Sequence, residues 1–458
     1  MPRRTLLPAA AAVLSLAAAA AAHEHHEHLD EEAQNKPVDA ILWIHIFLQM
    51  AVWGVLFPTG MVLGLSKSRW HVPLQSVGIA LTLGGYILGH AHGGRAFLAG
   101  IHGLFANIML APIFLQLALG IYLKLHIHEE SVRPWAVRFH SVVGKAYPVI
   151  GWAQMLFGAV AFRGYCRGGN LGQCLAHYIM GSGFIAYGII MAIMLLVGEA
   201  WIRRSQRSPE WWDSWIIMLW GIVNTFTEHH GGGWSHKDMQ HTVLGVVWWA
   251  GGLLGILLAR NNQRTVVPSI IMILTGWAFS EHAQSMMIST KIHAVFGDTL
   301  MLAGVARIVE VSFLAPRFAP LPPDAPSDDG TSEHTLADAP AGAGAPYHAV
   351  QAFRHLPPFL LVAAGVLFMS ATDEELRFVD AELEMDHVTY TLVMFSLAFL
   401  IYALAVSRIR LWASSGRHAA AAQGDGAIEL APAGKWYARV PGGEPEGAAH
   451  VIGDDDDE

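Results

Sequence analysis

The stretch ILWIHIFLQMAVWGVLFPTGMVLGL, residues 41–65, decides the fold class because it contains no charged side chain. An α-helix needs about 20 predominantly apolar residues to cross the hydrocarbon core of a bilayer. Ten more apolar stretches follow, and none shows the alternating polarity of a transmembrane barrel. The sequence thus predicts an all-α, polytopic helical membrane protein with about eleven transmembrane helices. The predicted spans are 41–65, 73–92, 97–123, 141–162, 175–198, 214–228, 242–259, 266–284, 293–313, 356–373 and 388–407.

The composition supports the same class. Only 14% of the 458 residues are charged and 53% are hydrophobic, whereas a soluble domain carries about 25% charged residues. These values disfavour a water-soluble enzyme and rule out disorder for most of the chain. The net charge of −9 comes without a basic stripe, so the predicted partner is the lipid bilayer and nucleic acid is not a predicted partner.

The first 22 residues have the pattern of a secretory signal peptide, with Arg3 and Arg4 before an apolar run and a string of alanines. Cleavage is predicted between Ala22 and His23, and an uncleaved anchor helix is the alternative. Lysine and arginine are concentrated in alternate loops, which predicts an outer or lumenal N-terminus and a cytoplasmic C-terminus. The expected location is a membrane of the secretory pathway: the endoplasmic reticulum, the vacuole or the plasma membrane.

Composition divides the chain into seven segments. They are a signal peptide at 1–22, a His-rich outer segment at 23–40, a four-helix core at 41–162, a helical domain with outer histidines at 163–313, a disordered cytoplasmic linker at 314–355, a two-helix part at 356–411 and an acidic cytoplasmic tail at 412–458. The HEHHEH run of the second segment either delivers metal ions or is a solvated tail.

Both cysteines fall in one predicted outer loop, FRGYCRGGNLGQC. Because an outer loop is in an oxidising compartment, Cys166 and Cys174 are predicted to form a disulfide. Two free thiols are the alternative.

Four histidines of the first four spans fall into two layers. His45 and His102 lie about one turn inside the outer ends of the first and third spans, and His71 and His140 lie at the inner ends of the second and fourth. Imidazoles on facing helices can bind a haem iron from both sides. The arrangement predicts one haem group in each leaflet and an electron path across the membrane. Four unrelated interfacial histidines are the alternative.

The residues around these histidines resemble cytochrome b561 domains over about residues 41–162. The matching residues are His45, Trp53, Gly54, Pro58 and Gly60 in the first span, His71 in WHVPLQSVG, His102 in HGLFANIML, and His140, Gly144 and Lys145 in FHSVVGKAYPVIGWAQMLFG. The resemblance implies that His45 and His102 hold one haem b, and that His71 and His140 hold the other. The Ala-Arg pair that usually follows Pro-x-Gly in that family is replaced here at 64–66, which speaks against ascorbate as the electron donor.

The rest of the chain resembles the fungal Ytp (yeast putative transmembrane protein) family, and the whole match runs from about 40 to 407. The motifs that carry it are MGSGFIAYG at 180–188, DSWIIMLWGIVNTFTEHHGGGW at 213–234, SHKDMQHTVLGVVWWAGGLLGI at 235–256, TGWAFSEHAQ at 275–284 and KIHAVFGDTLMLAGVARIVEV at 291–311. This resemblance implies an architecture more than a reaction.

Histidines and carboxylates gather at the predicted outer face of this second half. Imidazole combined with carboxylate suits copper, iron or zinc. The predicted ligands of such an ion are His229, His241, His282 and His293, and nearby carboxylates include Glu228, Asp238 and Asp298. A hydrogen-bonded cap that holds the helix ends together is the alternative.

Three functions fit these patterns. The first is a transmembrane haem b oxidoreductase, similar to a metal reductase, whose electron donor and acceptor the sequence does not identify. The second is a metal-ion or proton transporter that uses the outer histidines. The third is a structural membrane protein without chemistry. No fingerprint for nucleotide hydrolysis or nicotinamide binding is evident, and no inverted repeat is apparent.

Overall fold

The computed structural model describes residues 31–34, 36–229, 233–281, 284–314 and 345–422. Within this part of the chain, eight helices are long and apolar enough to cross a membrane, which confirms an all-α polytopic membrane protein. They are Ala40–Leu65, His71–Ala91, Ile101–Lys124, Gly168–Val197, Asp238–Leu258, Met287–Leu314, Ala349–Met369 and His387–Ser414. The predicted signal peptide and the HEHHEH run lie outside the described residues.

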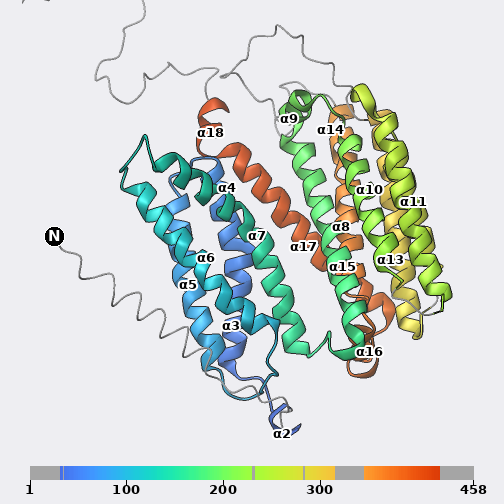
Figure 1. Ribbon diagram of the computed structural model, residues 1–458, viewed down its shortest axis with the longest axis horizontal. Helices are drawn as coiled ribbons and strands as arrows, with labels where there is room; N and C mark the ends of the chain where they lie inside the picture. Colours follow the sequence, from blue (N-terminus) through green and yellow to red (C-terminus); the bar gives the residue numbers. More distant parts are fainter. Residues whose placement is uncertain (1–30, 35, 230–232, 282–283, 315–344, 423–458) are drawn as a thin grey trace, which may run out of the picture.

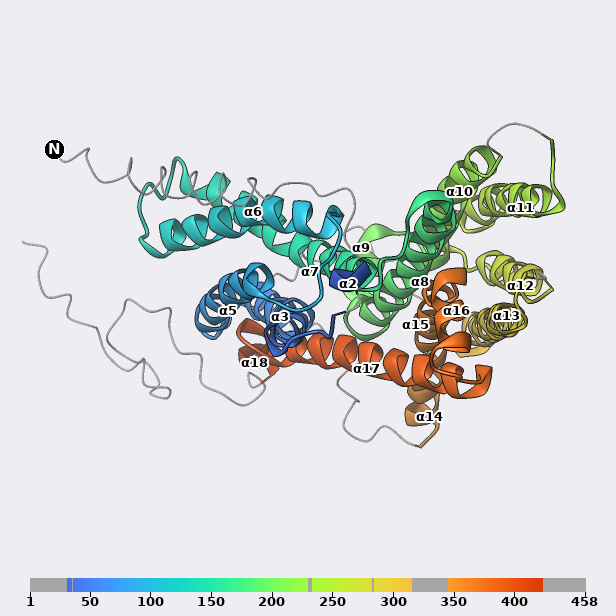
Figure 2. The ribbon, with the colours of Figure 1, turned by 90° about the horizontal axis from the view of Figure 1, so that it is seen from below.

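The first group of helices forms the left side of Figure 1. It begins with one continuous rod made of α3 (Ala40–Ala51), the π-helix η1 (Val52–Leu56) and α4 (Phe57–Leu65), followed by α5 (His71–Ala91), α6 (Ile101–Lys124) and α7 (Arg133–Arg163). The rod packs along α5, and α6 packs along α7. Successive helices run in opposite directions, so two antiparallel pairs face each other (Figures 1 and 2).

The second group forms the right side of Figure 1. It contains α8 (Leu171–Val197), α10 (Pro209–Thr227), α11 (His236–Leu258), α12 (Val267–Ser280), α13 (Met287–Val309, extended by the π-helix η4, Glu310–Leu314) and α15 (Leu356–Met369). Its main pairs are α10 with α11, α12 with α13, and α8 with α15. Gly276 and Gly297 let α12 and α13 approach so closely that a methyl group at either position would meet the other backbone. The fully buried Phe296, Leu300 and Leu361 fill the core behind this contact.

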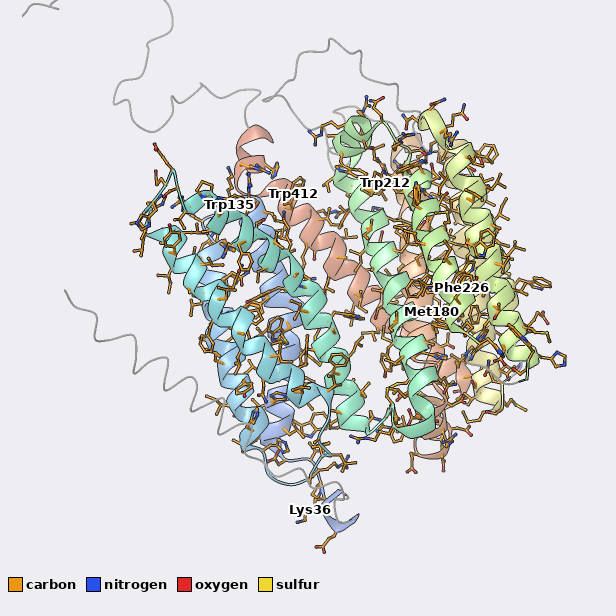
Figure 3. All side chains as sticks on the ribbon, in the orientation of Figure 1. Lys36, Trp135, Met180, Trp212, Phe226 and Trp412 are labelled. Atoms are coloured by element: carbon orange, nitrogen blue, oxygen red, sulfur yellow. A yellow bond between two sulfur atoms is a disulfide. The ribbon has the colours of Figure 1, made fainter. Side chains whose placement is uncertain are left out.

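Short helices mark the two ends of the molecule. They are α2 (Glu31–Gln34), η2 (Gly168–Asn170), α9 (Glu199–Ser205), η3 (Arg260–Asn262), α14 (Ala345–Arg354), α16 (Asp373–Ala381) and α18 (Arg417–Ala422). Helices α2 and α16 lie at the lower end of Figure 1, and α9, α14 and α18 lie at its upper end. These two ends are called the lower end and the upper end below. Trp135, Trp212 and Trp412 share one level near the upper end (Figure 3), as aromatic side chains do at a membrane–water interface.

Helix α17 (His387–Ser414) joins the two groups. It starts beside α15 and crosses to α4, which Figure 2 shows along one side of the molecule. Near its end, the Ser415 hydroxyl lies 2.8 Å from the hydroxyl of Ser66, at the end of α4. A second link joins α7 to α8, where Trp152 donates from Nε1 to Oγ of Ser182 at 2.9 Å.

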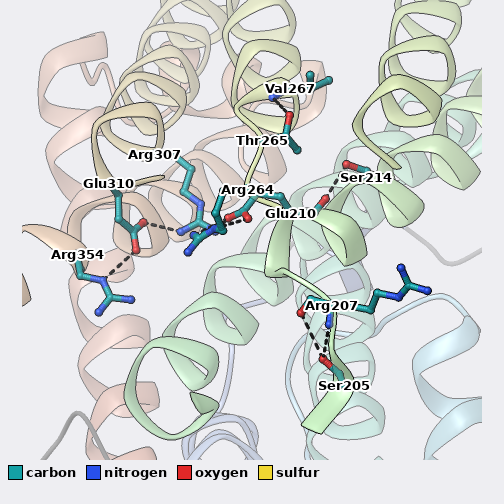
Figure 4. Close-up of polar contacts among 10 residues, drawn as sticks. All are labelled: Ser205, Arg207, Glu210, Ser214, Arg264, Thr265, Val267, Arg307, Glu310 and Arg354. Atoms are coloured by element: carbon teal, nitrogen blue, oxygen red, sulfur yellow. Dashed lines mark hydrogen bonds and ion pairs between the residues drawn. The ribbon is translucent and has the colours of Figure 1, made fainter. Parts of the chain in front are cut away.

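A chain of ion pairs fastens the upper end of the second group (Figure 4). Glu210 of α10 accepts from Arg264 at 2.6 Å and from Arg307 of α13 at 2.8 Å. Arg307 also pairs with Glu310 at 2.6 Å, and Glu310 accepts from Arg354 of α14 at 3.1 Å. These side chains are largely buried, and their alternating charges compensate one another. Arg307, isolated within an apolar span in the sequence, is therefore a structural member of this network.

The network explains one wrong prediction. The linker predicted as disordered over 314–355 includes residues 345–354, which form α14 and are anchored by the pair between Arg354 and Glu310. The rest of that linker, 315–344, lies outside the described residues. The tail predicted from residue 412 likewise begins with helix, because α17 continues to Ser414 and α18 follows.

The eleven predicted spans all coincide with helices, with shifted ends. Helices α7, α10 and α12 occupy the three spans that are too short or too polar to be counted with the eight. The fourth span was predicted from residue 141, yet α7 begins at Arg133, so His140 lies two turns inside the helix. Helix α16 was not predicted; its first turn is capped by the Thr372 hydroxyl, which accepts from the Glu375 amide.

Candidate functional site

His45 and His102 face each other near the lower end of the first group. Their ring centres are 6.2 Å apart and their planes are inclined by 84°. His45 donates from Nδ1 to the carbonyl oxygen of Gly85 at 2.6 Å. A carbonyl only accepts, so this bond fixes the proton on Nδ1 and leaves the lone pair on Nε2, the nitrogen that can bind a metal.

His71 and His140 repeat this arrangement near the upper end. Their ring centres are also 6.2 Å apart, and their planes are perpendicular at 90°. His71 donates from Nδ1 to the carbonyl oxygen of Gly60 at 2.7 Å, so its Nε2 also carries the lone pair. The structure therefore brings together both histidine pairs that the sequence analysis assigned to the two layers.

The separation of the rings suits two ligands on one iron. Two imidazoles that bind a metal from opposite sides, with metal–nitrogen bonds of about 2.0–2.1 Å, place their ring centres about 6.3 Å apart. The residues present therefore fit a haem with two axial histidines at both positions.

The two pairs are related by an internal repeat that sequence inspection missed. In α3, Gln49 follows His45 by one turn and donates to the carbonyl oxygen of Thr82 at 3.1 Å. In α5, Gln75 follows His71 by one turn and donates to the carbonyl oxygen of Phe57 at 3.4 Å. The rod from α3 to α4 and helix α5 are thus related by an inverted repeat. Each contributes a histidine and a glutamine that bind backbone carbonyl oxygens of the other.

Helices α6 and α7 are related to each other by a similar symmetry. Gln154 of α7 donates to the carbonyl oxygen of His102 at 3.0 Å, and Gln116 of α6 donates to that of His140 at 2.9 Å. Each glutamine follows the histidine of its own helix at the same spacing. The equal spacing of His and Gln in the two helices is a sign of the repeat that can be read from the sequence. It is hard to notice because the residues between them differ.

The π-helix η1 keeps the α3–α5 repeat in register. The segment from His45 to Gly60 is one residue longer than its equivalent from His71 to Gly85. A π-helix absorbs one extra residue within an α-helix, and η1 lies between the histidine and the glycine of the longer segment. Without η1, the Gly60 carbonyl would point away from His71.

Glycines provide the space that each imidazole occupies. A Cβ atom added at Gly89 would lie 2.7 Å from the ring of His45, and one added at Gly64 would lie 2.7 Å from the ring of His71. A Cβ at Gly158 would lie 3.1 Å from the ring of His102. Only glycine leaves these rings in position.

Cavities adjoin His45 and His102 at the lower end and His71 at the upper end. The lower cavity has a volume of about 480 Å³ and is lined by both His45 and His102, within the range of pockets that hold cofactors. Asp39 caps the first turn of α3 by accepting from the amides of Leu42 and Gly93, and these hydrogen bonds, led by that of Leu42, lower the pKa of the Asp39 carboxyl.

The upper cavity, about 460 Å³, opens beside His71 and is bordered by three cations, Lys67, Arg69 and Lys124. Between the two histidine pairs, Trp53, Phe57 and Tyr147 pack at ring distances of 4.8–5.5 Å. The first group therefore has a cavity at each end and a layer of aromatic rings between them, and the lining of the upper cavity includes His71 but not His140.

The structure joins Cys166 and Cys174, the two cysteines of the predicted outer loop, in a disulfide. Glu374 of α16 accepts from the Cys166 amide at 2.8 Å and from the Asn170 side chain at 3.0 Å. The bridged loop thereby docks α16 at the lower end. A site for metal is not implied here, because both sulfur atoms are used in the bridge.

The predicted metal ligands of the second half are not gathered at one point. His229 stacks on Trp234 with ring centres 4.0 Å apart and lies 3.8 Å from Asp238. His241 pairs with Glu228 at 3.1 Å, and His293 donates from Nδ1 to the carbonyl oxygen of Ser289 at 2.8 Å. His282 lies outside the described residues, and Asp298 is exposed on α13. Among the described residues, no three histidine or carboxylate ligand atoms of this set lie within 4.8 Å of one another.

One histidine of this region was missed by the sequence analysis. His177 of α8 is 7% exposed, and its ring centre lies 5.7 Å from that of His293. Together with His241 it lines a cavity of about 290 Å³ at the lower end of the second group. A lone histidine within an apolar span was its only signal, and only folding brings α8 beside α13.

Comparison with known proteins identifies the second group. The family model described as "Protein YTP1-like, C-terminal" matches residues 150–412, more than half of the chain. The chain belongs to the YTP1-like family. In this YTP1-like chain, a second model, described only as a domain of unknown function, matches residues 24–126, which include three of the four paired histidines.

The YTP1-like chain is similar to two yeast proteins in particular. Protein YTP1 of Saccharomyces cerevisiae is 45% identical over 256 residues, which cover 55% of this chain and 50% of that protein. The match therefore spans about half the length of YTP1. An uncharacterized membrane protein of Schizosaccharomyces pombe is 23% identical over 475 residues, which cover 74% of this chain and 93% of that protein. No solved structure is significantly similar to the chain.

Proposed function

We propose that this YTP1-like chain is a transmembrane electron-transfer protein that carries two haem b groups in a cytochrome b561-like domain. His45 and His102 hold one group, and His71 and His140 hold the other. The observation that carries the proposal is the equal ring separation of 6.2 Å in two nearly perpendicular imidazole pairs. Haem iron with two axial histidines exchanges single electrons between its ferric and ferrous states.

The chain's own residues fix the ligands before any group is bound. The carbonyl oxygens of Gly85 and Gly60 hold the Nδ1 protons of His45 and His71, so both rings are oriented and present Nε2. Two imidazoles at each position leave no open coordination site, which favours electron transfer over binding of a small molecule at the metal.

The layer between the pairs supports passage of electrons rather than of ions. Trp53, Phe57 and Tyr147 are at most 5% exposed and pack against one another. The indole of Trp53 is fixed by a 2.9 Å hydrogen bond to the Thr82 hydroxyl. Closely packed aromatic rings exclude water, which disfavours an ion path through this layer.

The two cavities differ in charge, because lysine and arginine are among the described residues that line the upper cavity and not among those that line the lower one. Three cations border the cavity beside His71 at the upper end. They favour an anionic group there, either a haem carboxylate or an anionic electron donor. The upper end, which also carries α14 and α18, is proposed to be cytoplasmic, and the lower end to be outer or lumenal. An electron acceptor would then be reduced beside His45 and His102.

The test is an absorption spectrum of the full-length protein purified in detergent, before and after reduction with dithionite. The proposal expects sharp visible bands on reduction and two haem groups per chain by pyridine extraction. A double variant, His102→Ala with His140→Ala, controls for haem bound adventitiously and should be colourless. A colourless wild-type protein that is folded would overturn the proposal and favour a transporter or a structural role.

A further inference from the structure

A cavity of about 530 Å³ lies between α8 and α10 of the second group. The main packed pairs join α10 to α11 and α8 to α15, so the sides of α8 and α10 that face each other line this cavity. Met272 of α12 and Leu300 of α13 belong to the rest of its lining. The volume is in the range of pockets that hold small molecules.

The cavity extends over about one leaflet of the membrane. On α10 its lining runs from Asp213 to Val223, a rise of ~15 Å along the helix, which is about half of the hydrocarbon core. Trp212, next to Asp213, is at the level of the interfacial tryptophans near the upper end, whereas the lining residue Met180 lies lower (Figure 3). One end of the cavity is therefore close to the membrane–water interface and the other is deep in the apolar region.

The polar groups that can bind a ligand are at the upper end of this cavity. Asp213 is the one charged side chain among the described lining residues, and it is 9% exposed. Within the described part of the chain, it forms no ion pair with the arginines of the neighbouring network. Tyr187 lies beside Asp213, and its buried hydroxyl has no hydrogen-bond partner among the described residues. The hydroxyl of Thr275, in contrast, already bonds to Ile271 and Trp248.

We propose that this cavity binds a membrane alcohol of the sterol class, with its hydroxyl between Asp213 and Tyr187. A hydroxyl group both donates and accepts hydrogen bonds. One ligand hydroxyl can therefore donate to the Asp213 carboxyl and accept from the Tyr187 hydroxyl. Leaving such buried groups without partners is costly, so the ligand would stabilise this end of the cavity.

The rest of the lining fits the apolar body of such a molecule. Phe184, Trp220 and Leu300 are among the side chains that it would contact. A phospholipid head group fits less well, because its phosphate and ester oxygens would be buried there without donors. A sterol in a bilayer keeps its hydroxyl at the interface and its rings among the acyl chains. It can therefore enter between α8 and α10 without turning over.

The experiment uses the full-length protein in phosphatidylcholine vesicles. The probe is a cholesterol analogue with a photoreactive diazirine on its ring system and an alkyne on its tail. The expected result is saturable labelling that unlabelled cholesterol displaces, with the modified residues on the facing sides of α8 and α10. The same sterol without its hydroxyl should compete at least about 10-fold less well, because it leaves both polar groups without a partner.

Two variants test the cavity. Gly183 lines it, and a Cβ atom at this position meets nothing within 4 Å. The side chain of Gly183→Leu should therefore extend into the cavity without displacing protein atoms and should abolish labelling. Tyr187→Phe should weaken binding by about 10-fold through loss of one hydrogen bond. Gly84→Leu in α5 is the matched control, because Gly84 is equally open but lies outside this cavity, and it should label like the wild type.

Folding is checked by gel filtration and thermal unfolding. Tyr187→Phe keeps the proposal testable if Gly183→Leu fails to fold, because the hydroxyl that it removes has no partner in the described part of the chain. Three results would each overturn the inference: no saturable labelling of the wild type, equal competition by the sterol without a hydroxyl, or unchanged labelling of folded Gly183→Leu. The inference is independent of the haem proposal, since none of the lining residues belongs to the first group.

Discussion

Arg408 of α17 donates from Nη2 to the carbonyl oxygen of Gly54 in the π-helix η1, at 2.8 Å. The widened turn of a π-helix leaves a backbone carbonyl without its usual partner inside the helix. A side chain more than 350 residues away in the sequence supplies that partner. Because η1 sets the register between His71 and Gly60, the second half of the chain supports a histidine pair in the first half.

Replacing Arg408 with alanine should therefore destabilise the first group of helices. Loss of the only side-chain donor seen at this carbonyl in the described residues should cost about 1–3 kcal/mol. The expected result is a lower thermal unfolding temperature in detergent. Arg410→Ala is the matched control, because Arg410 lies two residues further along the same helix and is exposed. Equal unfolding temperatures for the two variants would contradict this role.

Replacing either histidine of a pair should cause loss of the same haem group. If His45 and His102 bind one iron, replacing either with alanine should lower haem content by about half, and replacing both should remove no more. The same should hold for His71 and His140. Haem content is measured by pyridine extraction, alongside spectra that detect a high-spin iron with one ligand missing. An unchanged haem content in His102→Ala would remove this assignment.

The glycines that lie against the histidine rings should be required for haem binding at the same positions. In Gly89→Val, the added side chain would occupy the space of the His45 ring, so the lower haem should be lost while the upper one remains. The matched control is Gly84→Val in the same helix, where a Cβ atom meets nothing within 4 Å. Spectra and haem content of the two variants make the comparison. Similar losses in both would show that the effect is general rather than local.

The bridge between Cys166 and Cys174 gives a chemical prediction. In the denatured protein, neither cysteine should react with an alkylating reagent until a reductant is added. Mass spectrometry then counts two alkyl groups per chain after reduction and none before. Two groups before reduction would mean that the thiols are free.

The proposed orientation predicts which loops an impermeant reagent can reach. Helices α14 and α16 lie at opposite ends of the molecule (Figure 1). A cysteine placed at Ser332, which precedes α14 in the sequence, should be protected in intact cells, whereas one placed at Glu382, after α16, should be labelled. Labelling after permeabilisation serves as the positive control for Ser332→Cys. The opposite pattern would invert the topology.

Much of the candidate site could be predicted from the sequence because its ligands occur at helix positions that topology alone places in layers. His45 and His102 share a layer in any bundle in which the first and third spans run in the same direction. The partners of these rings could not be predicted. That the Gly85 carbonyl accepts from His45, and that Gly89 makes room for it, depends on the rotation of α5 about its own axis, which packing against α3 determines.

The metal-ligand prediction did not identify which histidines of the second group lie side by side. It grouped histidines by their nearness to helix ends, which is a one-dimensional property of the sequence. His229 satisfies that criterion but stacks on Trp234, while His177 was passed over and lies beside His293. Which side chains share a cavity depends on how four helices turn their faces toward each other.

The sequence by itself determined that this chain is a helical membrane protein, because long uncharged stretches must satisfy their backbone hydrogen bonds internally once they leave water. It also determined the layers of the four paired histidines, since helix rise and alternating direction fix depth. Only the tertiary structure decided the rest: the inverted repeats, the π-helix held by Arg408, and the buried network of Arg307 and Glu210. These depend on contacts between segments far apart in the chain, and such contacts arise from packing that no local pattern encodes.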